Sequence, residues 1–165
     1  MSSAKETLPQ RHGALQTSST ESESTEHVVR PVPLPTHCHC DRKECNGEVI
    51  EIVTSSASEI FLRCDPASFS GNHLTAYEQA QAFYGCLPRI LENAGSGMAN
   101  VVLERVFVRN MDTDLDSFLK AREQAYREVG LTGDQLPVTS YVEQPPCTPG
   151  QVFELQVYAV VPRTK

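Results

Sequence analysis

The stretch from Asn100 to Gly130 constrains the fold more than any other part of the chain. It opens with a valine-rich run, passes through an acidic turn, and continues with apolar residues at the three-and-four spacing of an amphipathic helix. The helical stripe consists of Leu115, Phe118, Leu119, Arg122, Tyr126 and Val129. Arg122 therefore takes a place that is normally apolar. Because a buried guanidinium needs a partner, we expect Arg122 to meet an acidic side chain or an anionic ligand.

The rest of the chain after residue 47 alternates between strand and helix patterns. Two β-rich runs separated by small residues predict a hairpin. A capping box at Thr75 and Glu78 predicts the start of a long helix that ends at Gly95 and bends near Pro88. The expected strands span residues 48–54, 59–64, 101–108, 137–142 and 152–161, and the expected helices span residues 75–94 and 115–129. This ββαβαββ order predicts an α+β fold of two layers, with both helices on one face of a mixed sheet.

Length and charge narrow the classes of protein to consider. A chain of 165 residues has room for one domain with a hydrophobic core and for tails. The net charge of −7 disfavours a nucleic-acid partner, which would require a basic face. No segment has the run of about twenty apolar residues that crosses a membrane, and the first residues lack a secretion-signal pattern. We therefore expect a cytoplasmic protein without membrane contact, whose six cysteines are thiols or metal ligands rather than disulfides.

Residues 1–36 are predicted to be a disordered tail, because they contain too few apolar side chains to offset the entropy of ordering. The proline-rich run Pro31–Pro35 favours an extended conformation. It is either a spacer or a short docking peptide for a protein partner. The folded domain is expected to span residues 47–165.

Residues 37–46 form a segment rich in cysteine and histidine. Its candidate metal ligands are His37, Cys38, His39, Cys40 and Cys45. Zinc suits such ligands, although structural zinc sites usually pair cysteines two to four residues apart across a longer loop. A zinc site, a redox-sensitive thiol and an ordinary exposed loop all remain open for this segment. Apart from this zinc ion, we expect no cofactor.

Several short motifs, in the order found here, resemble the Rid superfamily, also called the YjgF family. They are Ala80–Ala82, Leu91–Gly95 before a valine-rich strand, and Asn110–Asp114 followed by Phe118. The likeness covers about residues 47–163. It implies a chorismate-mutase-like fold and a homotrimer in which three sheets surround a central barrel. It also implies small-molecule clefts between subunits, which in active members hydrolyse enamines and imines derived from amino acids.

The resemblance also implies roles for individual residues. In deaminating members, an arginine two positions after a proline on the fifth strand binds the substrate carboxylate. Here Pro137 is followed at that distance by Thr139, and Tyr141 stands where a cysteine is common. This chain is thus similar to a divergent member that lacks the usual arginine. Glu154 on the last strand looks like the glutamate that positions water, and Arg122 aligns with a helical asparagine of the family.

Each candidate residue has a structural interpretation beside the functional one. Arg122 either pairs with an acid of a neighbouring subunit or replaces the missing arginine as a bidentate carboxylate clamp. Glu154 is either an interface acid or a general base. Three neighbouring residues supply hydroxyl groups to a ligand or are ordinary strand formers: Thr139, Ser140 and Tyr141. On the functional interpretation, Arg122 and Glu154 line the same intersubunit cleft.

Three functions are consistent with these observations. The leading hypothesis is a Rid-type homotrimer that binds a small carboxylate or carbonyl-bearing metabolite and, if it is an enzyme, acts as an enamine or imine deaminase in the hydrolase class. The second is a non-catalytic binding or scaffolding module of a larger complex, attached through the N-terminal tail. The third is a chorismatase-like hydrolase or lyase, although those enzymes are about twice as long.

Overall fold

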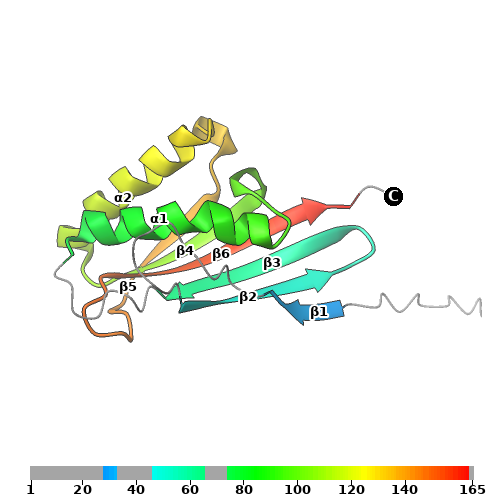
Figure 1. Cartoon of the computed structure of the whole chain (residues 1–165). Coiled ribbons are helices and arrows are strands. Elements are labelled where there is room, and N and C mark those ends of the chain that lie inside the picture. The colour runs from blue at the N-terminus through cyan, green and yellow to red at the C-terminus, as the bar shows by residue number, and fades with distance from the viewer. Residues whose placement is uncertain (1–27, 33–45, 66–73, 164–165) are drawn as a thin grey trace, which may run out of the picture.

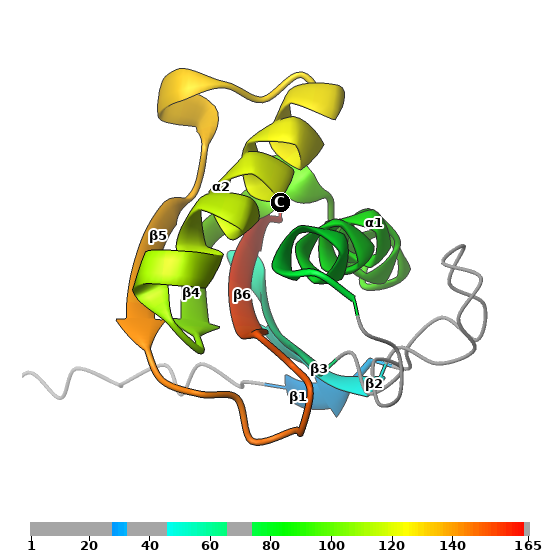
Figure 2. The ribbon, with the colours of Figure 1, turned by 90° about the vertical axis from the view of Figure 1, so that its left-hand side faces the viewer.

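The computed structural model of the chain describes residues 28–32, 46–65 and 74–163. Both helices lie on the same side of one sheet, so the fold has two layers (Figures 1 and 2). The strands are β1 (Val28–Pro31), β2 (Asn46–Val53), β3 (Ala57–Asp65), β4 (Val101–Val108), β5 (Val138–Glu143) and β6 (Phe153–Pro162), and the helices are α1 (Ala76–Asn93) and α2 (Met111–Glu128). The predicted α+β two-layer sandwich is confirmed.

The sheet has the strand order β1-β2-β3-β6-β4-β5. All neighbours are antiparallel except β4 and β5, which are parallel and are joined through α2. On β6, Phe153 packs its ring 4.9 Å from that of Phe118 in α2, so this face of the sheet is covered by the helices. Because side chains alternate along a strand, Glu154 and Gln156 point to the opposite face, called the open face below.

The helix ends follow from local hydrogen bonding. In α1, the Thr75 hydroxyl accepts from the Glu78 amide and the Glu78 carboxylate accepts in return, as the capping box predicted. In α2, Asn110 accepts from the Thr113 amide, so this helix begins four residues before the predicted start at Leu115. The prediction placed the helix start at the first apolar residue of the stripe. The polar first turn is held instead by the Asn110 cap and by acidic residues that favour a helix N-terminus.

The first strand was not predicted. Residues 28–31 were assigned to the disordered tail, and the structure shows them paired antiparallel with β2, so the prediction is wrong for this segment. Its side chains are exposed, which explains why the sequence shows no apolar pattern there. Backbone pairing and an ion pair hold it: Arg30 Nε donates to Glu51 Oε2 at 2.6 Å. The remaining residues of the predicted tail lie outside the described residues.

Two expectations drawn from composition can be compared with the structure. Within the described ranges, neither helix is long and apolar enough to span a membrane.

Cys86 is buried in α1 and is disulfide-bonded, so the expectation of free thiols is wrong at this position. That expectation rested on the cellular compartment, and residue spacing does not show which cysteines meet in space. Cys147 is free and exposed.

The Arg30–Glu51 pair makes the attachment of β1 sensitive to acid. The hydrogen bond from Arg30 lowers the pKa of Glu51 below its ordinary value, so this carboxylate stabilises the fold above its unfolded-state pKa. That contribution is lost as the pH falls through the lowered pKa. Arg30→Gln should therefore reduce thermal stability near pH 7, and its difference from the wild type should shrink below a pH of about 4.5. Melting curves across this range test the prediction, and a difference that does not change with pH would contradict it.

Candidate functional site

A buried polar cluster lies between α1, α2 and the sheet. At its centre the Glu104 carboxylate of β4 is fully buried. Tyr84 and Tyr126 donate their hydroxyl hydrogens to Glu104 Oε1 at 3.1 Å and 2.9 Å. Arg122 Nε donates to Glu104 Oε2 at 2.5 Å, and the Thr139 hydroxyl donates to the same oxygen at 3.1 Å. We call these five residues the Glu104 cluster.

The charges of the Glu104 cluster neutralise one another. Burial acts to lower the pKa of Arg122, but the adjacent Glu104 carboxylate outweighs it and raises that pKa above its ordinary value. Burial, followed by the charge of Glu104, raises the pKa of Tyr84 and of Tyr126. Both phenols therefore stay protonated and remain donors. A second guanidinium nitrogen of Arg122, Nη2, donates to the Pro137 carbonyl oxygen at 3.1 Å.

This arrangement explains why a helix carries an arginine on its apolar stripe. The sequence left two partners open for Arg122, an acid of a neighbouring subunit and an anionic ligand. The structure shows a third partner, Glu104 of the same chain. Glu104 was missed, although the valine-rich run around it on β4 shows a single acid at an inward position. A search for an acid to match Arg122 would have found it.

Two of the predicted ligand-binding residues also face the helices. Thr139 lies opposite Glu104 and bonds to it. Tyr141 is partly buried, and its ring packs edge-on against Phe118 with centroids 6.2 Å apart. Ser140, between them, is exposed on the open face. The predicted hydroxyl triplet therefore does not present three donors to one ligand.

Glu154 lies on the open face, where it pairs with Arg63 of β3. Arg63 Nε is 3.0 Å from Glu154 Oε1, and the Glu154 side chain is only 15% exposed. Arg122 and Glu154 are thus on opposite faces of the sheet. Within one chain they therefore do not line one cleft, and their meeting in a cleft between two subunits stays a prediction.

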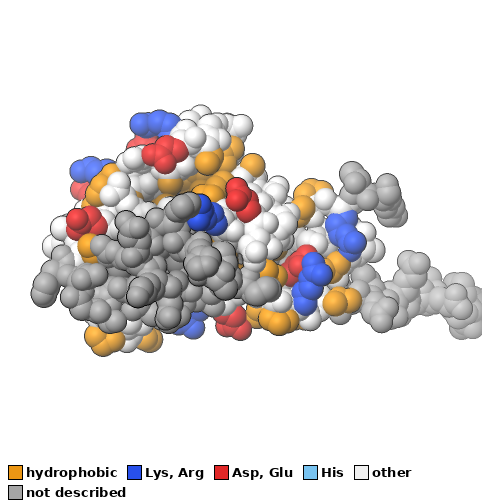
Figure 3. All heavy atoms as spheres, viewed as in Figure 1, with side chains coloured by type: hydrophobic (Ala, Val, Ile, Leu, Met, Phe, Trp, Pro, Cys, Tyr) orange, Lys and Arg blue, Asp and Glu red, His pale blue; other side chains and the backbone are white. Residues whose placement is uncertain are grey.

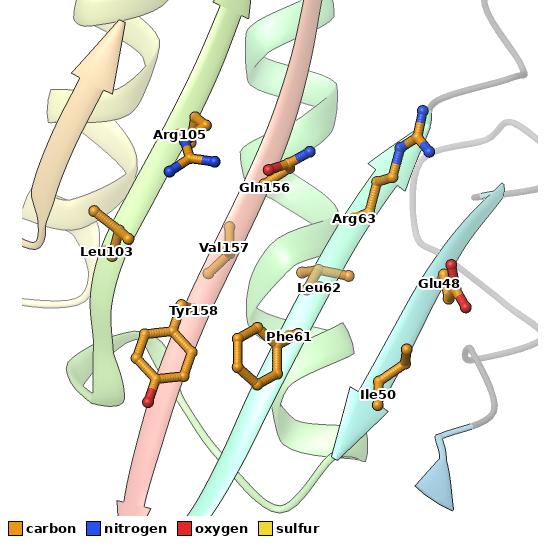
Figure 4. A pocket seen from close by; sticks show the side chains of 10 residues that line it. All are labelled: Glu48, Ile50, Phe61, Leu62, Arg63, Leu103, Arg105, Gln156, Val157 and Tyr158. Carbon is orange, nitrogen blue, oxygen red and sulfur yellow. The ribbon is translucent and has the colours of Figure 1, made fainter. Parts of the chain in front are cut away.

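A hollow of about 310 Å³ lies on the open face beside this ion pair. Figure 4 shows Arg105 next to Gln156 at one end, with the rings of Phe61 and Tyr158 side by side further along the strands. Other residues at its border are Glu48, Ile50, Arg63 and Leu103. The hollow combines an apolar floor with a few polar groups, as small-molecule sites do.

Arg105 is the residue that the sequence analysis missed at this hollow. It follows Glu104 directly, so it points to the open face, where it is exposed and lies opposite Gln156. Arg63 is engaged by Glu154, whereas no ion pair to Arg105 occurs among the described residues. Alternation along β4 could have placed Arg105 on the face opposite to Glu104, but its neighbours on β6 become known only from the register of the sheet.

The predicted zinc ligands, His37 to Cys45, lie outside the described residues. Within the described part of the chain, no three histidine, cysteine or acidic side chains come together in a way that could hold a metal ion. The zinc expectation therefore stays a prediction.

The fold is that of YjgF-family proteins. A protein of unknown function from Pseudomonas aeruginosa is 21% identical and has a TM-score of 0.57, covering 81% of this chain and 93% of that one. A YjgF-family member from Neisseria meningitidis is 20% identical with a TM-score of 0.54, covering 81% of this chain and 94% of that one. TdcF of E. coli with bound serine is 18% identical with a TM-score of 0.55, covering 67% and 85%.

These likenesses confirm the resemblance noted from the sequence at the level of the fold. No protein-family model and no curated protein sequence matches the chain. The chain thus shares its fold with YjgF-family structures at sequence identities of about 20%.

The Glu104 cluster predicts an asymmetry between two arginines of α2. Arg122→Met should destabilise the fold by about 3 kcal/mol, because the Glu104 charge loses its only cationic partner within the cluster. Arg127→Met is the matched control. Arg127 forms a surface pair with Glu123 in which both side chains are about two-thirds exposed, at 67% and 66%. Its loss should cost less than about 0.5 kcal/mol. Urea unfolding curves measure both, and equal effects would contradict a buried role for Arg122.

Proposed function

We propose that this chain is a divergent Rid-type protein that binds a small carboxylate- or carbonyl-bearing metabolite on its open face. The single observation that carries the proposal is Arg105, which has no ion-pair partner among the described residues and lies beside Gln156 in a hollow that Arg63, the partner of Glu154, also lines. The fold supports it, since TdcF, a protein of this fold, was crystallised with bound serine.

The side chains around the hollow suit an anionic ligand. A guanidinium recognises a carboxylate through two parallel hydrogen bonds, and Arg105 has its fork available for that contact. The Gln156 amide offers a donor and an acceptor next to it. Arg105 thus takes the clamping role that the sequence analysis gave to Arg122, which is fully occupied by Glu104.

Glu154 is the candidate catalytic residue for an imine substrate. Its carboxylate, held by Arg63, accepts a proton from water while the water oxygen bonds to the imine carbon, and it passes that proton to the nitrogen. The hydroxyl group of the resulting carbinolamine then gives its proton to the same nitrogen. Cleavage of the carbon–nitrogen bond then releases ammonia and leaves a carbonyl group. The proposed enzymatic activity is therefore hydrolytic deamination, without a cofactor.

A second candidate function is non-catalytic binding, and one observation favours it. Thr139, which stands in place of the family's arginine, is turned inward and bonded to Glu104. The carboxylate clamp proposed here thus lies at a new position, where Glu154 does not need to be aligned for water attack. Binding of a carboxylate without any release of ammonia would support this alternative.

The proposed assembly is a homotrimer in which a neighbouring copy closes the hollow. Outside the hollow, the open face carries apolar side chains that a lone chain leaves in water: Val142 is 38% exposed and Val138 is 71% exposed. In Figure 3, hydrophobic side chains reach the lower margin of the molecule in separate groups with charged side chains between them, on the side of the sheet away from the helices. Exposed apolar patches of this kind are typical of interfaces.

Light scattering coupled to size exclusion tests the assembly. We expect a mass three times that of the 18.2 kDa chain. Val138→Glu should weaken the trimer, since it introduces a charge on the open face. Val129→Glu, at an exposed position beyond the end of α2, should leave it intact. A monomer at micromolar concentration would rule out the intersubunit cleft.

Calorimetry with pyruvate tests the carboxylate clamp. Arg105→Gln should weaken pyruvate binding by about tenfold or more, because a charge-assisted contact is lost. Arg127→Gln, which removes an exposed arginine of α2, should have no effect. Glu154→Gln should preserve binding and lower the rate of ammonia release from a freshly generated imine. If Arg105→Gln binds pyruvate as the wild type does, the proposed site is wrong.

A further inference from the structure

Resting on the proposed function, we infer that the metabolite bound at this hollow is an arylalkyl carboxylate, such as a 2-oxo acid with an aromatic side chain. The inference comes from the aromatic surface next to Arg105.

Phe61 and Tyr158 form a flat apolar surface on the open face. They lie opposite each other on β3 and β6, and their rings stack with centroids 4.8 Å apart at an interplanar angle of 28°. The Tyr158 hydroxyl donates to Glu59 Oε2 at 3.0 Å, so its polar end is already satisfied and points away from the hollow's charged end. Phe61 is 42% exposed, which leaves its ring available to a third aromatic group.

The spacing between this surface and Arg105 selects a ligand length. Arg105 lies opposite Gln156, and Tyr158 lies two residues further along β6, on the same face. Two residues along a strand span about 7 Å. A ligand that reaches both needs a short link between its carboxylate and its ring. The two-carbon link of phenylpyruvate fits this requirement.

The volume of the hollow and the charges at its border also favour an arylalkyl carboxylate. The hollow of about 310 Å³ leaves room for more than a three-carbon acid. Arg63 is neutralised by Glu154, so one cation, Arg105, is available within the hollow for a single anionic group. The rest of the border near the rings is aliphatic, from Ile50 and Leu103. A monocarboxylate with an apolar, planar end complements this pattern.

Calorimetry of the full chain with phenylpyruvate and pyruvate tests the inference. The wild type should bind phenylpyruvate about tenfold or more tightly than pyruvate. Phe61→Ala should reduce this preference to less than about threefold, because it weakens phenylpyruvate binding more than pyruvate binding. Phe61→Leu, which keeps apolar bulk without the ring, should lie between the two. Val129→Ala is the control, because Val129 is apolar and 47% exposed, close to the 42% exposure of Phe61. It should behave as the wild type.

A second readout uses the absence of tryptophan from the chain. Indole-3-propionate can be followed by its own fluorescence, which should shift to shorter wavelength on binding and return when phenylpyruvate is added. Equal affinities for phenylpyruvate and pyruvate would overturn the aromatic site while leaving the proposed carboxylate clamp in place. If neither acid binds, the proposed function fails together with this inference.

Discussion

One carboxylate holds the two layers of this protein together. Glu104 lies on β4, next to the edge strand, and accepts hydrogen bonds from α1 through Tyr84, from α2 through Arg122 and Tyr126, and from β5 through Thr139. Apolar packing alone lets helices slide over a sheet, whereas hydrogen bonds to one buried charge require a single arrangement. The Arg122 fork also reaches the Pro137 carbonyl, so the same contact fixes the start of β5. The placement of both helices and of the edge strand therefore depends on this residue.

Much of the fold was predictable because its determinants are local. The capping box at Thr75, the stop at Gly95 and the apolar stripe of α2 each indicate an element from a few neighbouring residues, and together they gave the two-layer architecture. The exposed strand β1 was not predictable in this way. It is held by backbone pairing and by the contact between Arg30 and Glu51, which lie 21 positions apart in the chain.

The site was harder to predict because it depends on which face a residue occupies. Arg122 was correctly singled out as a buried charge that needs a partner, but the partner could be found only by locating a second inward charge on another element. The family resemblance then linked Arg122 to Glu154, although a sheet separates them. Arg105 was not predicted as a site residue, because an exposed arginine on a strand indicates no function until its neighbours across the sheet are known.

The adjacent residues Glu104 and Arg105 have a consequence for how β4 aligns during folding. A strand that shifts by one residue turns every side chain to the other face. In β4 such a shift would bring Arg105 beside the Arg122 guanidinium in a dry interior and expose Glu104 to water, so two like charges would meet without a counterion. Valine-rich strands are otherwise prone to misalignment, because their apolar side chains fit either face. The two opposite charges of this dipeptide therefore favour a single alignment of the strand.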